Sequence, residues 1–176
     1  YPTCQFQIVG RCEDENPSGI SREESERLAA EYDVDFVPGT DDVRPYLAAC
    51  SVFVLPSYYR EGLPRTILEA LASARPVITT DLPGCRDAIE VGTNGLLVEP
   101  RSSESLARAM MQFAAHPSSV ERMGAASLEI ARKTYDVRKV NRQLLGEMGL
   151  LQTSATRHTQ KSTIAGSASL HTSTGN

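Results

Sequence analysis

The sequence lacks the cysteine pattern of a secreted, disulfide-bonded domain. It contains four cysteines in 176 residues, with neither a close CxxC pair nor a dense, even spacing: Cys4, Cys12, Cys50 and Cys85. The three histidines lie far from these cysteines in the sequence, so no group with metal-ligand spacing can be assembled. We therefore expect no disulfide framework and no metal site, and a reducing compartment is the simpler interpretation.

Excess positive charge and long apolar runs are also missing. The formal net charge is -4 at pH 7, so the chain as a whole has no electrostatic footprint for nucleic acid. No run reaches the roughly 18 apolar residues of a membrane span, and Tyr1 opens the chain without a signal-peptide pattern. We expect a soluble chain that begins partway through a longer protein, because no Met starts it and a strand pattern begins at Gln5.

Short β-rich runs alternate with helical patterns over most of the chain. This alternation predicts an α/β domain of the Rossmann-like, doubly wound type with a parallel sheet and a helical C-terminal end. Two runs do not alternate with polar residues and predict strands covered on both faces, namely 52–55 and 77–78. The five expected strands span residues 5–10, 34–37, 51–55, 76–80 and 95–99.

Helix boundaries are marked by capping residues. Ser21 with Glu24 predicts a capping box, Asp41 or Asp42 is expected to cap a short helix, and Pro64 is expected to begin the helix that follows it. Three later helices are expected over about 103–116, 118–133 and 137–148. We predict one domain over residues 1–150 and a disordered Ser/Thr-rich tail over residues 151–176.

The residues after Leu55 and after Thr80 are the place to look for a ligand, because open α/β sheets bind ligands at the carboxyl ends of their strands. After Leu55, a loop leads into the Pro64 helix, whose free N–H groups form a ready phosphate site. Pro64 has no N–H, so the available donors are those of four neighbours: Gly62, Leu63, Arg65 and Thr66.

Two glutamates in this segment are candidates for a role. Glu69 lies on a polar stripe with Thr66 and Ser73 along an otherwise apolar helix, so hydroxyls or a cation should meet its carboxylate. Alternatively, Glu69 pairs with Arg65 one turn back or faces water. Glu61 could simply favour the positive end of the helix dipole.

These residues carry a resemblance to a known family. The segment PSYYREGLPRTILEALASARPVITTDLPGCRDAIEVGTNGLLVEP is similar to the signature region of the family 4 retaining glycosyltransferases of the GT-B fold, including their E-x7-E motif at Glu61 and Glu69. The likeness extends from Gln5 to about Gly149. It implies the C-terminal, donor-binding domain of an enzyme that transfers sugar from a nucleotide-diphosphate sugar, UDP being the expected nucleotide, without a metal or other cofactor.

The resemblance also implies a role for each matching residue. Glu61 would support the charge that develops on the donor sugar, and Glu69 would accept hydrogen bonds from the ribose hydroxyls. Sugar and diphosphate oxygens would be held by the backbone N–H groups of Gly62, Leu63, Arg65 and Thr66. The base would be bordered by Val37 and Pro38.

Family members typically build bacterial surface polysaccharides, so the implied partners are a nucleotide sugar and a glycan or polyprenyl-linked acceptor held by a second, N-terminal domain. We expect a cytoplasmic placement, with peripheral membrane contact left open, and no turnover by this fragment alone. The sequence departs from the family at Ala74, where glycine is usual, and it lacks the first strand and the basic residues that neutralise the diphosphate.

Other functions remain open at this point. A non-catalytic nucleotide-binding regulatory module is the main alternative, and an epimerase or a phosphorylase would share the fold family. A phosphorylase would need a lysine for pyridoxal phosphate, and none occurs between Tyr1 and Arg132. For Cys85 no base is apparent, so a buried thiol is expected, and the segment from Gly92 to Gly95 predicts a tight turn without a ligand.

Overall fold

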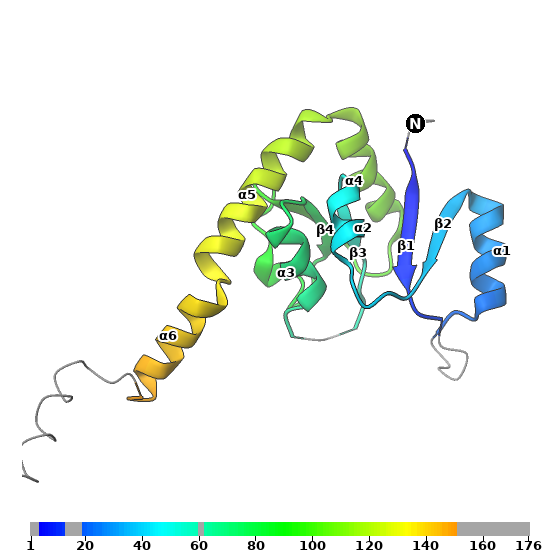
Figure 1. Cartoon of the computed structure of the whole chain (residues 1–176). Coiled ribbons are helices and arrows are strands. Elements are labelled where there is room, and N and C mark those ends of the chain that lie inside the picture. Colours follow the sequence, from blue (N-terminus) through cyan, green and yellow to red (C-terminus); the bar gives the residue numbers. More distant parts are fainter. Residues whose placement is uncertain (1–3, 13–18, 60–61, 151–176) are drawn as a thin grey trace, which may run out of the picture. The chain divides into compact units, whose positions relative to one another are not determined.

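The computed structural model describes residues 4–12, 19–59 and 62–150. The chain divides into two compact units, residues 1–135 and residues 136–176 (Figure 1). The first unit holds the five strands found among these described residues, every one paired in parallel with its neighbour. The expected tail, residues 151–176, lies outside the described residues.

The first sheet has two strands, β1 (Phe6–Gly10) and β2 (Val34–Pro38), joined through the helix α1 (Arg22–Tyr32). Phe6 pairs with Val34 and Gly10 pairs with Pro38 at the two ends of the register. As the sequence predicts, Ser21 caps α1, because its hydroxyl accepts the Glu24 N–H at 3.2 Å.

The second sheet has the order β3–β4–β5, with β3 (Phe53–Leu55), β4 (Val77–Thr80) and β5 (Gly95–Val98). All four residues of β4 are buried, as expected for a central strand, whereas β3 is only half-buried. The expectation of full burial was wrong for β3 because this strand lies at an edge of its sheet.

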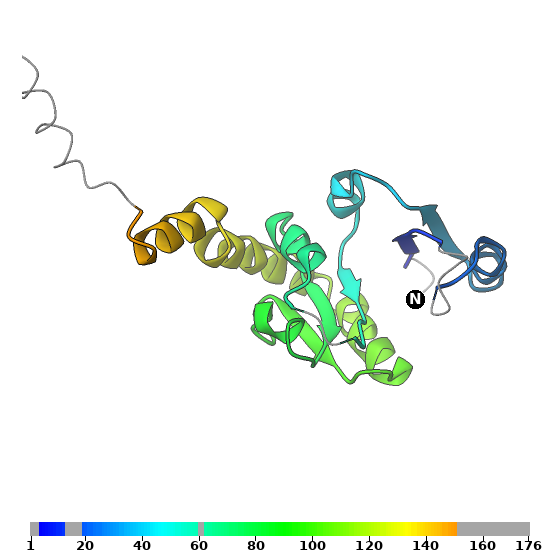
Figure 2. The same ribbon diagram turned by 90° about the horizontal axis from the view of Figure 1, so that it is seen from below.

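Helices cover both faces of the second sheet. These are α2 (Arg44–Ala49), α3 (Arg65–Ala72), α4 (Ser103–Ala115) and α5 (Ser118–Thr134), together with a short 3₁₀ helix η1 (Arg86–Ala88). Successive strand residues point to opposite faces, so Val77 packs into a cluster with α2, α3 and the end of α5, and Ile78 packs into another with α4 and the start of α5. Figure 2 shows α3 and α4 on opposite sides of these strands.

The five strands form two sheets, where the sequence predicts one. One sheet pairs β1 with β2, and the other has the order β3–β4–β5. Among the described residues no strand pairing joins the two sheets. Apolar side chains of β1 are correspondingly exposed, including Phe6 and Ile8.

Several helix ends differ from the sequence-based expectation by one or two residues. Val43 is the N-cap of α2, and Asp42 instead accepts the Arg44 N–H at 3.1 Å. Pro64 is the N-cap of α3 rather than its first helical residue. In the second unit, Asp136 is the N-cap of α6 (Val137–Glu147), and its carboxylate accepts the Arg138 N–H at 2.9 Å.

Candidate functional site

The loop that leaves β3 is fixed to the end of β4 by two buried hydroxyl groups. Thr79 Oγ1 donates to the Leu55 carbonyl at 2.8 Å, and Thr80 Oγ1 donates to the Ser57 carbonyl. Both threonines are almost completely buried, so these bonds are shielded from water. The carboxyl end of the sheet therefore has a defined loop that leads toward α3.

The start of α3 presents backbone donors next to this loop. The first helical hydrogen bond runs from the Ile67 N–H to the Pro64 carbonyl at 3.1 Å, so the amides of Arg65 and Thr66 precede it. Helix N-termini offer such amides, and the positive end of the dipole, to anions. Pro64 is buried, and its fixed φ, here -62°, sets the entry into the helix.

Glu69 lies one turn into α3 and pairs with Arg65. The Arg65 guanidinium Nε donates to Glu69 Oε1 at 2.9 Å, while the side chain of Glu69 is 29% exposed and that of Arg65 is 90% exposed. The pairing that the sequence offers as an alternative is therefore present. An exposed i, i+4 pair of this kind contributes only about 0.3–0.5 kcal/mol, so competing hydroxyls can displace it at small cost.

The other residues predicted for this site lie in a gap of the described chain or directly after it. Gly62 is exposed, and Leu63 packs against the apolar cluster beneath α3. Glu61, the predicted catalytic residue, lies outside the described residues, as does Arg60. Among the described residues, the free amides of Arg65 and Thr66 begin α3, and Glu69 lies one turn further along the same helix.

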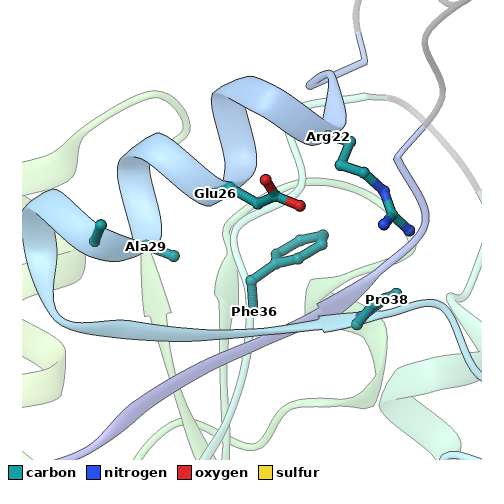
Figure 3. A pocket seen from close by; sticks show the side chains of 6 residues that line it. Arg22, Glu26, Ala29, Phe36 and Pro38 are labelled. Carbon is teal, nitrogen blue, oxygen red and sulfur yellow. The ribbon is translucent and has the colours of Figure 1, made fainter.

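A pocket of about 370 Å³ lies between α1 and β2 in the first sheet (Figure 3). Phe36 and Pro38 form its apolar side, and the ring of Phe36 points toward α1, where Arg22 and Glu26 line the other side. Of the two residues expected to border the base, Pro38 lines this pocket. Val37 is not among its lining residues, because successive residues of a strand face opposite ways.

An aromatic cluster at the carboxyl ends of the strands received no role from the sequence. The rings of Tyr58 and Tyr59 lie 4.4 Å apart between centroids, and their hydroxyls are 3.0 Å apart. The Arg101 guanidinium lies over the Tyr58 ring, 4.7 Å from its centroid. The hydrogen bond with Tyr59 raises the pKa of Tyr58 above its usual value. The sequence signal that could have found this cluster is the aromatic pair Tyr58-Tyr59, which begins three residues after β3.

Two further expectations are confirmed by the structure. Cys85 is fully buried in the cluster beneath α3, which agrees with an inert thiol. The segment from Gly92 to Gly95 forms a tight turn, with Gly92 at φ +78° and its N–H donating to the Gly95 carbonyl at 2.9 Å. Neither feature contributes to the site.

The described ranges contain neither a metal-binding group of side chains nor a helix that could span a membrane. Among residues 4–12, 19–59 and 62–150, no group of three or more His, Cys, Asp or Glu side chains could hold a metal ion. In the same part of the chain, no helix combines the length and apolar character that crossing a membrane requires.

Comparison with known proteins identifies the family. A model of the family described as glycosyl transferases group 1 matches residues 1–116. The chain belongs to this family. The likeness stated from the E-x7-E segment is thereby confirmed, and the fold is that of the C-terminal domain of GT-B glycosyltransferases.

Two curated relatives illustrate the similarity of this group 1 domain. An uncharacterized glycosyltransferase of Haemophilus influenzae is 30% identical over 142 residues, covering 80% of this chain and 38% of the relative. An N,N'-diacetylbacillosaminyl-diphospho-undecaprenol alpha-1,3-N-acetylgalactosaminyltransferase of Campylobacter jejuni is 36% identical over 101 residues, covering 57% of this chain and 25% of the relative. The chain therefore spans less than half the length of these relatives.

Solved structures agree on the fold. Sucrose-phosphate synthase from Thermosynechococcus elongatus matches with TM-score 0.72 and 28% identity, covering 82% of this chain and 37% of that one. Anabaena HepE in complex with UDP matches with TM-score 0.77 and 24% identity, covering 86% of this chain and 42% of the HepE chain. The C-terminal domain of a Francisella tularensis group 1 glycosyl transferase matches with TM-score 0.67 and 21% identity, covering 78% of this chain and 72% of that domain.

Proposed function

We propose that this chain is the donor-binding domain of a retaining glycosyltransferase that moves a sugar from a UDP-sugar to a glycan or polyprenyl-linked acceptor in surface polysaccharide assembly. The observation that carries the proposal is the end of α3, where the amides of Arg65 and Thr66 lie one turn from the carboxylate of Glu69. These amides suit a diphosphate, and the carboxylate suits two neighbouring ribose hydroxyls.

The relatives support the nucleotide and the acceptor class. HepE, which has a similar fold, has been solved in complex with UDP, and a second structure of the same protein is a complex with UDP-glucose. The Campylobacter relative is named for a diphospho-undecaprenol acceptor. Further relatives are named for lipopolysaccharide core and colanic acid biosynthesis.

In this proposal the chain supplies binding and electrostatic stabilisation without a metal or cofactor. The α3 amides hold the departing diphosphate without reorganising, and preorganised donors of this type are a large source of transition-state stabilisation. Pro38 borders the base, with the pocket beside Phe36 as its apolar surface, whereas Val37 on the same strand faces away from this pocket. Glu61 takes the role at the donor sugar that the family resemblance implies.

The binding of UDP-glucose to the chain, measured by isothermal titration calorimetry, tests the proposal. We expect Glu69→Gln to weaken binding by about 10- to 150-fold, since a hydrogen bond to a charged group contributes about 1.5–3 kcal/mol. Arg65→Gln breaks the same ion pair but keeps the carboxylate and the amide, so it should retain binding.

A matched control is Glu104→Gln, which alters an exposed glutamate in the first turn of α4. Its affinity should equal that of the unchanged chain. If Glu69→Gln binds UDP-glucose as tightly as the unchanged chain does, the ribose role is wrong. If neither the unchanged chain nor any of its variants binds a nucleotide sugar, the donor-binding proposal fails as a whole.

A further inference from the structure

Thr80, the last residue of the central strand β4, has an almost completely buried side chain. Its hydroxyl donates to the carbonyl of Ser57, which lies two residues beyond the end of β3. The pairing of β3 with β4 ends at Leu55 and Thr79, so the Thr80 hydroxyl bonds the main chain of the loop and not that of the strand. Because the hydroxyl is buried, this bond is shielded from water. Thr80 is therefore placed to fix the beginning of the loop that follows β3.

Residues 56–63, which we call the donor loop, lead from β3 to the start of α3. The family resemblance assigns the N–H groups of Gly62 and Leu63 in this loop to donor oxygens. It assigns Glu61, which follows Ser57 by four residues in the sequence, to the donor sugar. Groups that must meet a substrate in one orientation need rigid support from neighbouring elements. The position of the Ser57 main chain therefore bears on donor binding.

The described part of the donor loop is held at both ends. Leu63 packs against the apolar cluster beneath α3, and the Thr80 hydroxyl holds Ser57 at the other end. The Arg101 guanidinium also contacts the Tyr58 ring, 4.7 Å from its centroid. Tyr58 is exposed, and an exposed cation–π contact is weak. The buried Thr80 bond is therefore the firmer of these two contacts at the start of the loop.

We propose that Thr80 is a positioning residue for donor binding, whose hydroxyl keeps the donor loop in the conformation that binds the nucleotide sugar. This inference rests on the proposed function, because it assumes that the loop contacts the donor. Without the hydroxyl, only a fraction of the molecules hold the loop in this conformation, and the apparent affinity falls by that fraction. The usual net contribution of one hydrogen bond corresponds to a loss of about 3- to 10-fold.

Isothermal titration calorimetry with UDP-glucose tests the inference through two substitutions in the whole chain. Thr80→Val keeps the volume of the side chain but removes the hydroxyl, so binding should weaken by about 3- to 10-fold. Thr80→Ser keeps the hydroxyl but removes a buried methyl group, so it should bind within about twofold of the unchanged chain while losing some stability in urea. If affinity merely followed packing, Thr80→Ser, which leaves a cavity, would bind more weakly than Thr80→Val. That order would overturn the inference.

Thr79→Val is the matched control. Thr79 is also fully buried on β4, and its hydroxyl also donates to a carbonyl, that of Leu55 at 2.8 Å. Leu55 is the last residue of β3 and is held by the strand pairing as well, so losing this bond should not release the donor loop. We expect Thr79→Val to bind UDP-glucose as the unchanged chain does. Equal affinities of Thr79→Val and Thr80→Val would overturn the inference.

A measurement without nucleotide separates failure of this inference from failure of the proposed function. NMR signals of ¹³C-labelled tyrosine rings, assigned with Tyr58→Phe and Tyr59→Phe, report on the loop directly after Ser57. We expect Thr80→Val to shift both signals and Thr79→Val to leave them in place. Unshifted signals in Thr80→Val would show that the hydroxyl does not hold the loop, which overturns the inference. Shifted signals in a chain that does not bind UDP-glucose would instead contradict the proposed function, and with it only the donor-binding part of the inference.

Discussion

Ala74 offers a quantitative test of how α3 ends. The helix closes in a Schellman motif, in which the Arg75 N–H donates to the Ala70 carbonyl and the Ala74 N–H donates to the Leu71 carbonyl, each at 3.0 Å. This motif places Ala74 in the left-handed region, with φ +57°. Glycine is the residue that adopts this conformation without a steric penalty, so Ala74→Gly should stabilise the fold.

The expected gain follows from two opposing terms. A non-glycine residue in the left-handed region costs roughly 1–2 kcal/mol, and this cost disappears in Ala74→Gly. The added freedom of glycine in the unfolded chain takes back about 0.5–1 kcal/mol. We expect a net increase in the free energy of unfolding of about 0.5–1 kcal/mol and a rise in Tm of about 1–4 °C.

Urea unfolding followed by circular dichroism at 222 nm measures this change. Ala72→Gly is the matched control, because Ala72 is the last residue of α3 and is exposed. Glycine there should cost about 0.5–1 kcal/mol, since it loses helix propensity with no strain to relieve. If both substitutions destabilise the chain, the left-handed strain assigned to Ala74 is wrong.

Three further outcomes test the packing and the aromatic cluster. Gly95→Ala should destabilise by about 1–3 kcal/mol in the same urea assay, because its Cβ would lie 2.2 Å from the Val77 carbonyl oxygen of the paired strand. Asn94→Leu should cost about 2–4 kcal/mol, since the buried amide bonds two backbone groups, at 2.7 and 2.9 Å, that would lose their partner. Tyr59→Phe should lower the pKa of Tyr58 toward its ordinary value, because the hydrogen bond that raises this pKa is lost. Absorbance at 295 nm, followed with rising pH, would then show Tyr58 ionising earlier than in the unchanged chain.

Local sequence patterns were sufficient to predict the helices and strands and part of the candidate site. The strand of Val77 and Ile78 could be predicted as central because apolar residues that do not alternate with polar ones imply cover on both faces. Ser21 and Pro64 marked helix starts through local chemistry, which depends on residues within one turn. The pairing of Arg65 with Glu69 was one of the interpretations that the i, i+4 spacing allowed.

Features that depend on distant residues could not be predicted in this way. The division into two sheets depends on which strands are hydrogen-bonded neighbours, and the five apolar runs do not encode this order. The contact of Arg101 with Tyr58 joins the loops after two different strands, so no spacing in the sequence signals it. Val37 and Pro38 were expected to act together, although strand alternation turns only Pro38 into the pocket.

The pairing of Glu69 with Arg65 is compatible with a ligand role for Glu69. A carboxylate that is 29% exposed beside an apolar helix face needs a hydrogen-bonding partner, and Arg65 supplies one. Because the arginine side chain is 90% exposed, the pair is screened by water and weak. In the proposed function, the ribose hydroxyls of a nucleotide whose diphosphate contacts the amides at the start of α3 can replace this ion pair at little cost, so the ion pair satisfies the carboxylate without competing seriously with a substrate.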